Sequence, residues 1–170
     1  QVSVLASSSS GNSTYIETKN HKILVDAGLS RKKLAELMQS IDRNLEDLDT
    51  IFITHEHSDH IQGLGVLMRQ LDVNVYANAK TWDAITSKNS MGEIPTDKIQ
   101  ILEANQTLSL DDVDIESYHV SHDAIDPQFY QFSSDNKRFT ILTDTGYVSE
   151  KLEAKISNSD AYLLEFNHDM

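Results

Sequence analysis

Short runs of alternating or continuous apolar residues recur along the chain, and small polar residues separate them. Such runs are typical of strands, because successive side chains of a strand point to opposite faces. The pattern predicts strands at Val2–Leu5, Thr14–Glu17, Lys22–Val25, Thr50–Ile53, Val73–Ala77, Ile99–Leu102, Val113–Tyr118, Phe129–Phe132, Phe139–Thr143 and Ala161–Leu164.

Apolar residues spaced three and four apart predict helices between these strands. The predicted helices are one capped by Ser30 with the apolar face Leu34, Leu37, Met38 and Ile41, one with the stripe Ile61, Leu64, Leu67, Met68 and Leu71, one from about Lys80, and one over Val148–Ile156. Strands outnumber helices, and helices fall between small groups of strands. This order favours an α+β fold in which two sheets pack face to face with helices outside.

The composition is that of an ordinary globular domain, with 39% hydrophobic and 24% charged residues in a chain of 170. No apolar run approaches the roughly 18 residues of a membrane helix, so we expect no spanning segment. The absence of cysteine excludes disulfides and thiolate ligands and suits a reducing cytosol. The net charge of −13 opposes binding to nucleic-acid phosphates unless bound cations or a local basic patch reverse the field.

Three of the seven histidines lie within six residues, in the run His55-Glu56-His57-Ser58-Asp59-His60 between a predicted strand and a predicted helix. In an extended chain residues two apart point the same way, so His55 and His57 can close on one ion. A turn then lets Asp59 and His60 face a second ion. Imidazole and carboxylate ligands suit zinc or manganese, and iron less well. A surface histidine cluster that binds nothing is the alternative, and it explains the spacing less well.

Later strand ends supply further candidate ligands, His122 and Asp144. A carboxylate such as that of Asp144 can bridge two ions, although alone it would be a turn former. Asp26, which also ends a predicted strand, is expected to accept a hydrogen bond that orients a ligand or a bound water. We expect His119 to be structural, since an alternating strand points it and His122 to different places.

Two polar segments are candidates for contact with an anionic substrate. The serine-rich turn 7–13, with Ser9 and Asn12, offers hydroxyl and N–H groups that can cradle phosphate, or it is a flexible polar turn. The run Arg31-Lys32-Lys33 can anchor a nucleic-acid backbone through Arg31 and Lys32, or it is a solvated helix face. Aromatic residues make up only 7% of the chain, which argues against a base-stacking platform for single strands.

These candidate residues resemble, in their order, the successive metal motifs of the metallo-β-lactamase superfamily: Asp26, His55-x-His57-x-Asp59-His60, His122 and Asp144. The resemblance implies an αββα sandwich over residues 1–170, with two divalent metal ions at one edge of the sheets. It implies a first site formed by His55, His57 and His122. It implies a second site formed by Asp59 and His60, with Asp144 as the bridge. The nucleophile would be a hydroxide between the ions, with Asp59, Asp26 and His122 in the catalytic set.

Further motifs resemble the YycJ (WalJ) subfamily: Val2-Ser3-Val4-Leu5-Ala6-Ser7 with Ser9-Ser10-Gly11-Asn12-Ser13, Ser121-His122-Asp123-Ala124, Thr143-Asp144-Thr145-Gly146 and Glu165-x-Asn167-His168-Asp169. Ser8 stands where that subfamily has glycine. The resemblance implies a bacterial cytoplasmic metal-dependent hydrolase, with DNA as substrate. The superfamily adds a last histidine to the second site, and only His168 follows Asp144. We assign His168 to the substrate side and expect the chain to lack a C-terminal segment.

The candidate site alone permits several reactions. The first hypothesis is a phosphodiesterase that acts on nucleic acid, specifically a 5′–3′ exonuclease on DNA. The alternative is a hydrolase of a small ester, thioester or cyclic phosphodiester, which the acidic charge favours. A metal-stabilised binding module without turnover and, further off, a di-iron oxidoreductase are the remaining hypotheses. The sequence leaves the oligomeric state open.

Overall fold

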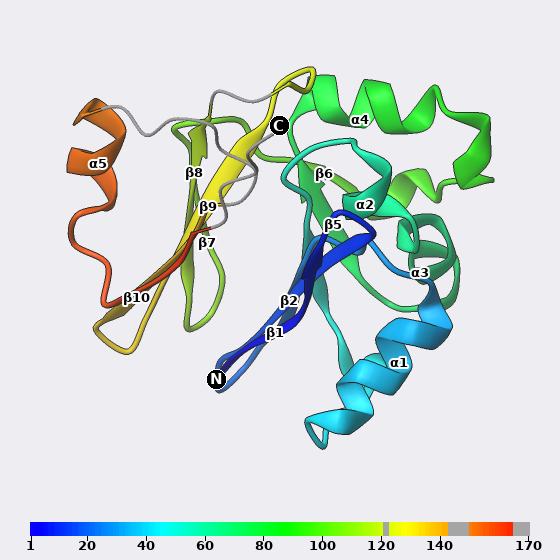
Figure 1. The fold of residues 1–170 in the computed structure, drawn as a ribbon, viewed down its shortest axis with the longest axis horizontal. Coiled ribbons are helices and arrows are strands. Elements are labelled where there is room, and N and C mark those ends of the chain that lie inside the picture. The colour runs from blue at the N-terminus through cyan, green and yellow to red at the C-terminus, as the bar shows by residue number, and fades with distance from the viewer. Residues whose placement is uncertain (121–122, 143–149, 165–170) are drawn as a thin grey trace.

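The computed structural model of the protein describes residues 1–120, 123–142 and 150–164, and it contains two sheets packed face to face (Figure 1). The first sheet has six strands in chain order: β1 Val2–Ser8, β2 Gly11–Glu17, β3 Lys22–Val25, β4 Thr50–Phe52, β5 Asn74–Ala77 and β6 Ile99–Ile101. The second sheet has five strands in the order β11 Ala161–Leu164, β10 Lys137–Leu142, β9 Gln128–Ser134, β8 Asp114–His119 and β7 Thr107–Ser109.

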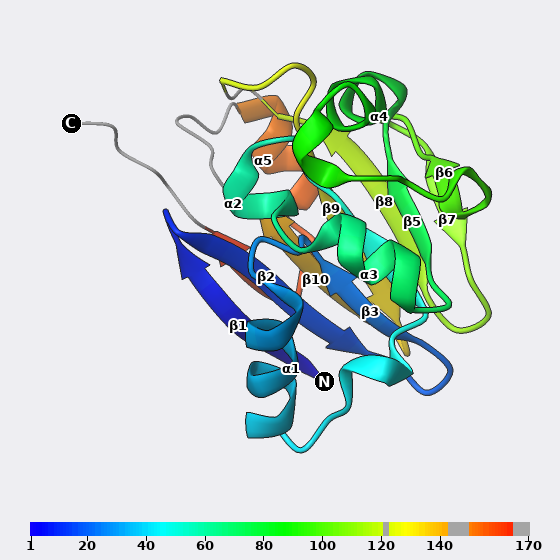
Figure 2. The same cartoon turned by 90° about the vertical axis from the view of Figure 1, so that its right-hand side faces the viewer.

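Helices cover the outer face of each sheet. Their bounds are α1 Arg31–Ser40, α2 Ser58–Ile61, α3 Leu64–Gln70, α4 Ala79–Thr86 and α5 Glu150–Ile156, with 3-10 turns at Leu45–Asp47, Asn89–Met91 and Thr96–Lys98. Figure 2 shows α1, α3 and α4 in front of the first sheet, whereas α5 lies beyond the second sheet in Figure 1. The predicted αββα order of layers is confirmed.

Two large apolar clusters hold these layers together. One lies between the first sheet and its helices and includes Leu24, Ile51, Leu34 and Leu67, all fully buried. The other lies between the sheets and contains the aromatic residues Phe52, Tyr130 and Phe132, where the ring centroids of Phe52 and Tyr130 are 5.2 Å apart. Burial of apolar surface on both faces explains why the strands of the first sheet form continuous apolar runs.

The strand order of the first sheet places several loop residues at one edge. Strands β3, β4, β5 and β6 are parallel, with Val25 paired to Phe52 and Phe52 to Tyr76. Their carboxyl ends therefore meet at the same edge, where Asp26 follows β3 and Thr54 follows β4. The antiparallel hairpin of β1 and β2 turns at that edge as well, because Thr14 pairs with Val25.

The helix predicted over Ile61–Leu71 is wrong in one respect, since the structure divides it into α2 and α3. The break lies at Gly63, whose N–H donates to the Ala27 carbonyl at 2.9 Å. A Cβ at Gly63 would lie 2.2 Å from the Leu29 carbonyl oxygen, so this position brings two backbones into contact. The apolar stripe itself is buried as expected, because both helices turn it towards the first sheet.

An ion pair ties β2 to the segment after α1 and makes stability depend on pH. Arg43 donates to the Glu17 carboxylate at 2.7 and 3.1 Å, and the Tyr15 hydroxyl donates to it at 2.7 Å. These hydrogen bonds, that of Arg43 first, lower the pKa of Glu17 to about 2. Because the pKa is lower in the folded state, this stabilisation is complete above about pH 4.5 and is lost as the pH falls towards 2.

We expect Glu17→Gln to lower the free energy of unfolding by about 1 kcal/mol at pH 7 and by much less near pH 2. Urea unfolding at both pH values measures this. Glu46→Gln is the matched control, because Glu46 pairs with Arg31 but its side chain is 52% exposed. An equal loss at both pH values would contradict the assignment.

Candidate metal centre

The predicted histidine cluster lies directly after β4, at the edge of the sheets where α2 begins. His55 and His60 are buried, with 1% and 0% of their surface exposed, whereas His57 is partly exposed at the cap of α2. The ring centroid of His55 is 4.7 Å from that of His57 and 4.0 Å from that of His60. Asp59 Oδ2 lies 3.4 Å from His60 Nε2. The four side chains predicted as metal ligands in this run are therefore neighbours in space.

Asp26 lies beneath the cluster and forms a buried hydrogen-bond network with Thr54 and His60. Its Oδ1 accepts the Thr54 N–H at 2.8 Å, and its Oδ2 lies 2.8 Å from Thr54 Oγ1 and 2.7 Å from His60 Nδ1. Asp26 is 2% exposed and has a φ of 63°, in the left-handed region that non-glycine residues rarely adopt. The carboxylate is thus aimed away from solvent and towards the residues that follow β4.

This Asp26–Thr54–His60 network fixes which nitrogen of two histidines carries the proton. A carboxylate only accepts, so His60 donates through Nδ1 and its Nε2 is the acceptor nitrogen. The single Thr54 hydroxyl proton goes to Asp26, so Thr54 Oγ1, 2.9 Å from His55 Nδ1, accepts from that nitrogen. His55 therefore also has Nε2 as its acceptor. Acceptor nitrogens are the form in which imidazole binds a metal.

Asn12 contacts the cluster from the start of β2. It is 6% exposed, and its Nδ2 lies 2.9 Å from Asp59 Oδ2, 3.3 Å from His60 Nε2 and 2.9 Å from the Ser8 carbonyl oxygen. Gly28 permits this approach, because a Cβ there would lie 1.7 Å from the Asp59 carbonyl oxygen. The structure thus gives Asn12 a buried position against two predicted ligands, whereas Ser9 is exposed in the turn before β2.

The donor set fits a divalent ion in its chemistry. The Asp59 carboxylate accepts from Asn12 Nδ2 at 2.9 Å and is partly exposed, with 22% of its side-chain surface accessible. An anionic carboxylate beside imidazole acceptors is the kind of ligand set that zinc and manganese accept. Among the described residues no three His, Asp or Glu side chains already converge on one point at metal-binding distance. His122 and Asp144, two of the six predicted ligands, lie outside the described residues, as does His168.

The basic triplet Arg31-Lys32-Lys33 begins α1. Arg31 pairs with Glu46, and Lys33 Nζ lies 3.9 Å from Glu36 Oε2. Lys32 is exposed, and no ion pair of its side chain is recorded in the part of the chain that the structure describes. Two of the three cations are therefore partly neutralised by acidic neighbours.

The structure adds two residues that the sequence did not single out. Thr54 links Asp26 to His55, as described above. The Glu56 carboxylate is 6% exposed and its Oε1 accepts the Ile125 N–H at 3.1 Å, while its carbonyl accepts from Lys88 Nζ at 2.7 Å. Glu56 thereby joins the histidine run to the loop that follows β8. In the sequence, the position of Glu56 between two histidines was the feature that could have indicated this role.

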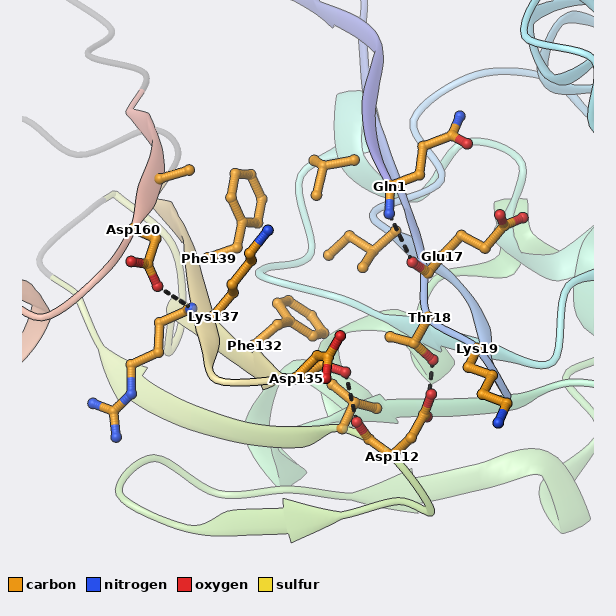
Figure 3. Close-up of a pocket in the computed structure, with 16 residues that line it drawn as sticks. Gln1, Glu17, Thr18, Lys19, Asp112, Phe132, Asp135, Lys137, Phe139 and Asp160 are labelled. Atoms are coloured by element: carbon orange, nitrogen blue, oxygen red, sulfur yellow. Dashed lines mark hydrogen bonds between the residues drawn. The ribbon is translucent and has the colours of Figure 1, made fainter.

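A cavity of about 710 Å³ lies elsewhere, between the ends of the two sheets (Figure 3). Figure 3 shows Gln1 and Glu17 on one side of it and Lys137 and Phe139 on the other, and Thr18 Oγ1 donates to Asp112 Oδ1 at 2.9 Å. Glu17 ends β2, whereas Asn12 near its start touches the cluster. Five residues of strand separate the two, or roughly 17 Å. The cavity therefore belongs to a different region from the histidine cluster.

Comparison with known proteins adds the family. The profile described as "Beta-lactamase superfamily domain" matches residues 21–169. The chain is 53% identical over 168 residues to the exodeoxyribonuclease WalJ of Streptococcus pneumoniae serotype 2, covering 99% of the chain and 62% of WalJ. It is 46% identical to the exodeoxyribonuclease YycJ of Bacillus anthracis, covering 99% of the chain and 63% of YycJ. The chain thus spans less than two thirds of the length of these relatives.

Solved structures share the fold at low sequence identity. The crystal structure of Zn²⁺-bound PqqB from Methylobacterium extorquens matches with a TM-score of 0.75 and 16% identity, covering 91% of this chain and 59% of that one. None of the helices in residues 1–120, 123–142 and 150–164 has the length and apolar character needed to cross a bilayer.

Proposed function

Because the chain belongs to the metallo-β-lactamase superfamily, we propose that the histidine cluster is the centre of a metal-dependent hydrolase that acts on phosphodiesters. The observation that carries this proposal is the Asp26–Thr54–His60 network, which leaves Nε2 as the acceptor nitrogen of both His55 and His60, whose ring centroids are 4.0 Å apart. A histidine cluster with a purely structural role does not require that hydrogen bonds fix the tautomer of each ring.

The residues divide into those that would hold ions and those that orient them. His55 and His57, together with His122, would hold one ion; Asp59 and His60 would hold the other, with Asp144 between them. When bound, two divalent ions lower the pKa of water and stabilise charge on the attacking and leaving oxygens. We assign to Asp59, whose side chain is 22% exposed, the role of orienting a water molecule and accepting its proton. Asp26 orients His60 and, through Thr54, His55.

The substrate we propose is DNA, attacked as in a 5′–3′ exonuclease. The support is the identity to WalJ and YycJ, both named exodeoxyribonucleases, over 99% of this chain. We assign phosphate contact to the exposed residues Lys32 and Ser9 and to the partly exposed Arg31, and His168 remains a prediction. The net charge of −13 opposes the approach of DNA, so bound cations and the basic residues near the site would have to offset it.

A small-molecule hydrolase of the same fold is the second candidate. The acidic charge favours it, since small neutral esters or thioesters are not repelled by a field of this sign. Both candidates use the same ligand residues and differ only in what the rim of the site accepts.

Metal-free protein prepared by chelation and then titrated with zinc or manganese tests the proposal. We expect uptake of about two ions per chain, and metal-dependent cleavage of a 5′-labelled oligonucleotide that exceeds cleavage of simple esters. Ester cleavage without oligonucleotide cleavage would favour the second candidate. Failure to bind either metal would contradict both.

A further inference from the structure

The amide of Asn12 occupies the space between Asp59 and His60, and this placement has a consequence for metal uptake. Four electron-rich atoms, Asp59 Oδ2, His60 Nε2 and the carbonyl oxygens of Ser8 and Asp59, lie 2.9, 3.3, 2.9 and 3.4 Å from its Nδ2. Acceptors that converge in this way on one point form the surroundings that a cation occupies. In this structure the neutral amide nitrogen of Asn12 occupies the position on which these acceptors converge.

The nitrogen alone sets the position of this side chain. Asn12 Oδ1 is buried and has no hydrogen-bond partner among the described residues, so it does not hold the amide in place. The backbone is fixed independently, because the Asn12 carbonyl accepts the Gly28 N–H at 2.9 Å. The strand is therefore held at residue 12 by a hydrogen bond that does not involve the side chain.

We propose that Asn12 is a positioning residue that holds Asp59 and His60 together in the metal-free protein and is displaced when the second ion binds. An amide N–H₂ only donates, so it cannot share that point with a cation. Zinc would also lie about 2.0–2.2 Å from its nitrogen and oxygen ligands, closer than Nδ2 lies now. An ion bound through Asp59 Oδ2 and His60 Nε2 must therefore break the hydrogen bonds of Asn12. We accordingly expect the first ion to bind on the His55–His57 side of the cluster.

This inference rests on the proposed dinuclear centre. Variants of Asn12 distinguish a failure of the inference from a failure of the proposed function. Asn12→Ala removes the competing donor. Asn12→Asp places a carboxylate against that of Asp59, so the two repel each other until a cation lies between them. Both variants should be less stable without metal and should bind the second ion more tightly. A residue that only supports the fold would lower stability and metal affinity together.

The experiment is stepwise titration of the chelated 170-residue chain with zinc and with cobalt, followed by calorimetry and cobalt absorption, with thermal unfolding of each metal-free protein. We expect second-ion affinity to rise about ten-fold in Asn12→Ala, as loss of one charge-assisted hydrogen bond allows, and further in Asn12→Asp. The first step should stay unchanged. Gln131→Ala is the matched control, because Gln131 is a buried amide with a bonded Nε2 and an Oε1 that lacks a partner among the described residues.

Weaker or unchanged second-ion binding in both Asn12 variants would overturn the inference. A wild-type protein that binds only one ion would contradict the dinuclear centre of the proposed function. The inference about Asn12 would still stand if Asn12→Asp bound a second ion. If Asn12→Asp gains none in that case, the inference falls as well.

Discussion

Replacing His57 by alanine is expected to leave the protein folded while hydrolysis falls by about 10³-fold or more, since metal chemistry supplies several kcal/mol to the transition state. His57 caps α2 through its backbone, with φ −62° and ψ 145°, and its side chain makes no capping hydrogen bond to the helix. Alanine can adopt the same backbone. The loss should therefore appear in metal content and turnover, measured by mass spectrometry and oligonucleotide cleavage, and hardly in the unfolding midpoint.

His21→Ala is the control for this variant. His21 lies in the turn between β2 and β3 at the opposite end of the sheet, with a side chain 17% exposed and Nδ1 3.0 Å from Asp49 Oδ1. Its removal should leave metal content and turnover unchanged. If His57→Ala retained full metal content and activity, His57 would not be a ligand and the division of the cluster into two sites would be wrong.

Asp26→Asn is expected to lower metal affinity by about 100-fold and the free energy of unfolding by about 2 kcal/mol. Asparagine tolerates the positive φ of this position, so backbone strain does not change. In the wild type, Thr54 Oγ1 and His60 Nδ1 both donate to Asp26 Oδ2. The amide nitrogen of asparagine in that place can only donate to them. His60 must then accept at Nδ1 and carry its proton on Nε2. The Thr54 hydroxyl, now an acceptor for the amide, donates to His55 Nδ1, which also moves the His55 proton to Nε2.

One substitution thus blocks the metal-binding nitrogens of two histidines. Nitrogen-resolved NMR of the histidine rings should show the change of tautomer directly, and metal titration should show its effect. Asp49→Asn is the matched control, because Asp49 also contacts a histidine Nδ1, a threonine hydroxyl and a backbone N–H, at 3.0, 2.6 and 2.7 Å. It should change stability without changing metal binding. Metal affinity in Asp26→Asn within two-fold or so of wild type would refute the proton-control argument.

Much of the fold follows from local patterns. Strands β3 and β11 begin and end at the predicted residues, because their apolar runs are bounded by polar turns. Strand β7, Thr107–Ser109, was not predicted, since three residues carry no periodicity and pairing with β8 alone makes them a strand. The break between α2 and α3 also depends on distant residues, because Gly63 contacts Leu29 across the fold.

The candidate site divides in the same way. His55, His57, Asp59 and His60 stand in one run, so spacing alone predicted their proximity. The role of Thr54 depends on β3 and β4 being neighbours, which the sequence does not state. The position of Asn12 depends on the β1–β2 turn bringing residue 12 next to residue 59. The expected ligands His122 and Asp144 lie outside the described residues and remain predictions.

The Asp26–Thr54–His60 network bears on how the chain folds as it is made. Its members, and Asn12, all lie within the first 60 residues, and β2, β3 and β4, which carry them, are adjacent in the sheet. Strand β7, the first of the second sheet, begins only at Thr107. A ribosome adds residues in order, so this half of the centre has emerged before any strand of the second sheet. A nascent chain could then capture an ion early, and the bound ion would hold β3 and β4 in register while the remaining strands are still being synthesised.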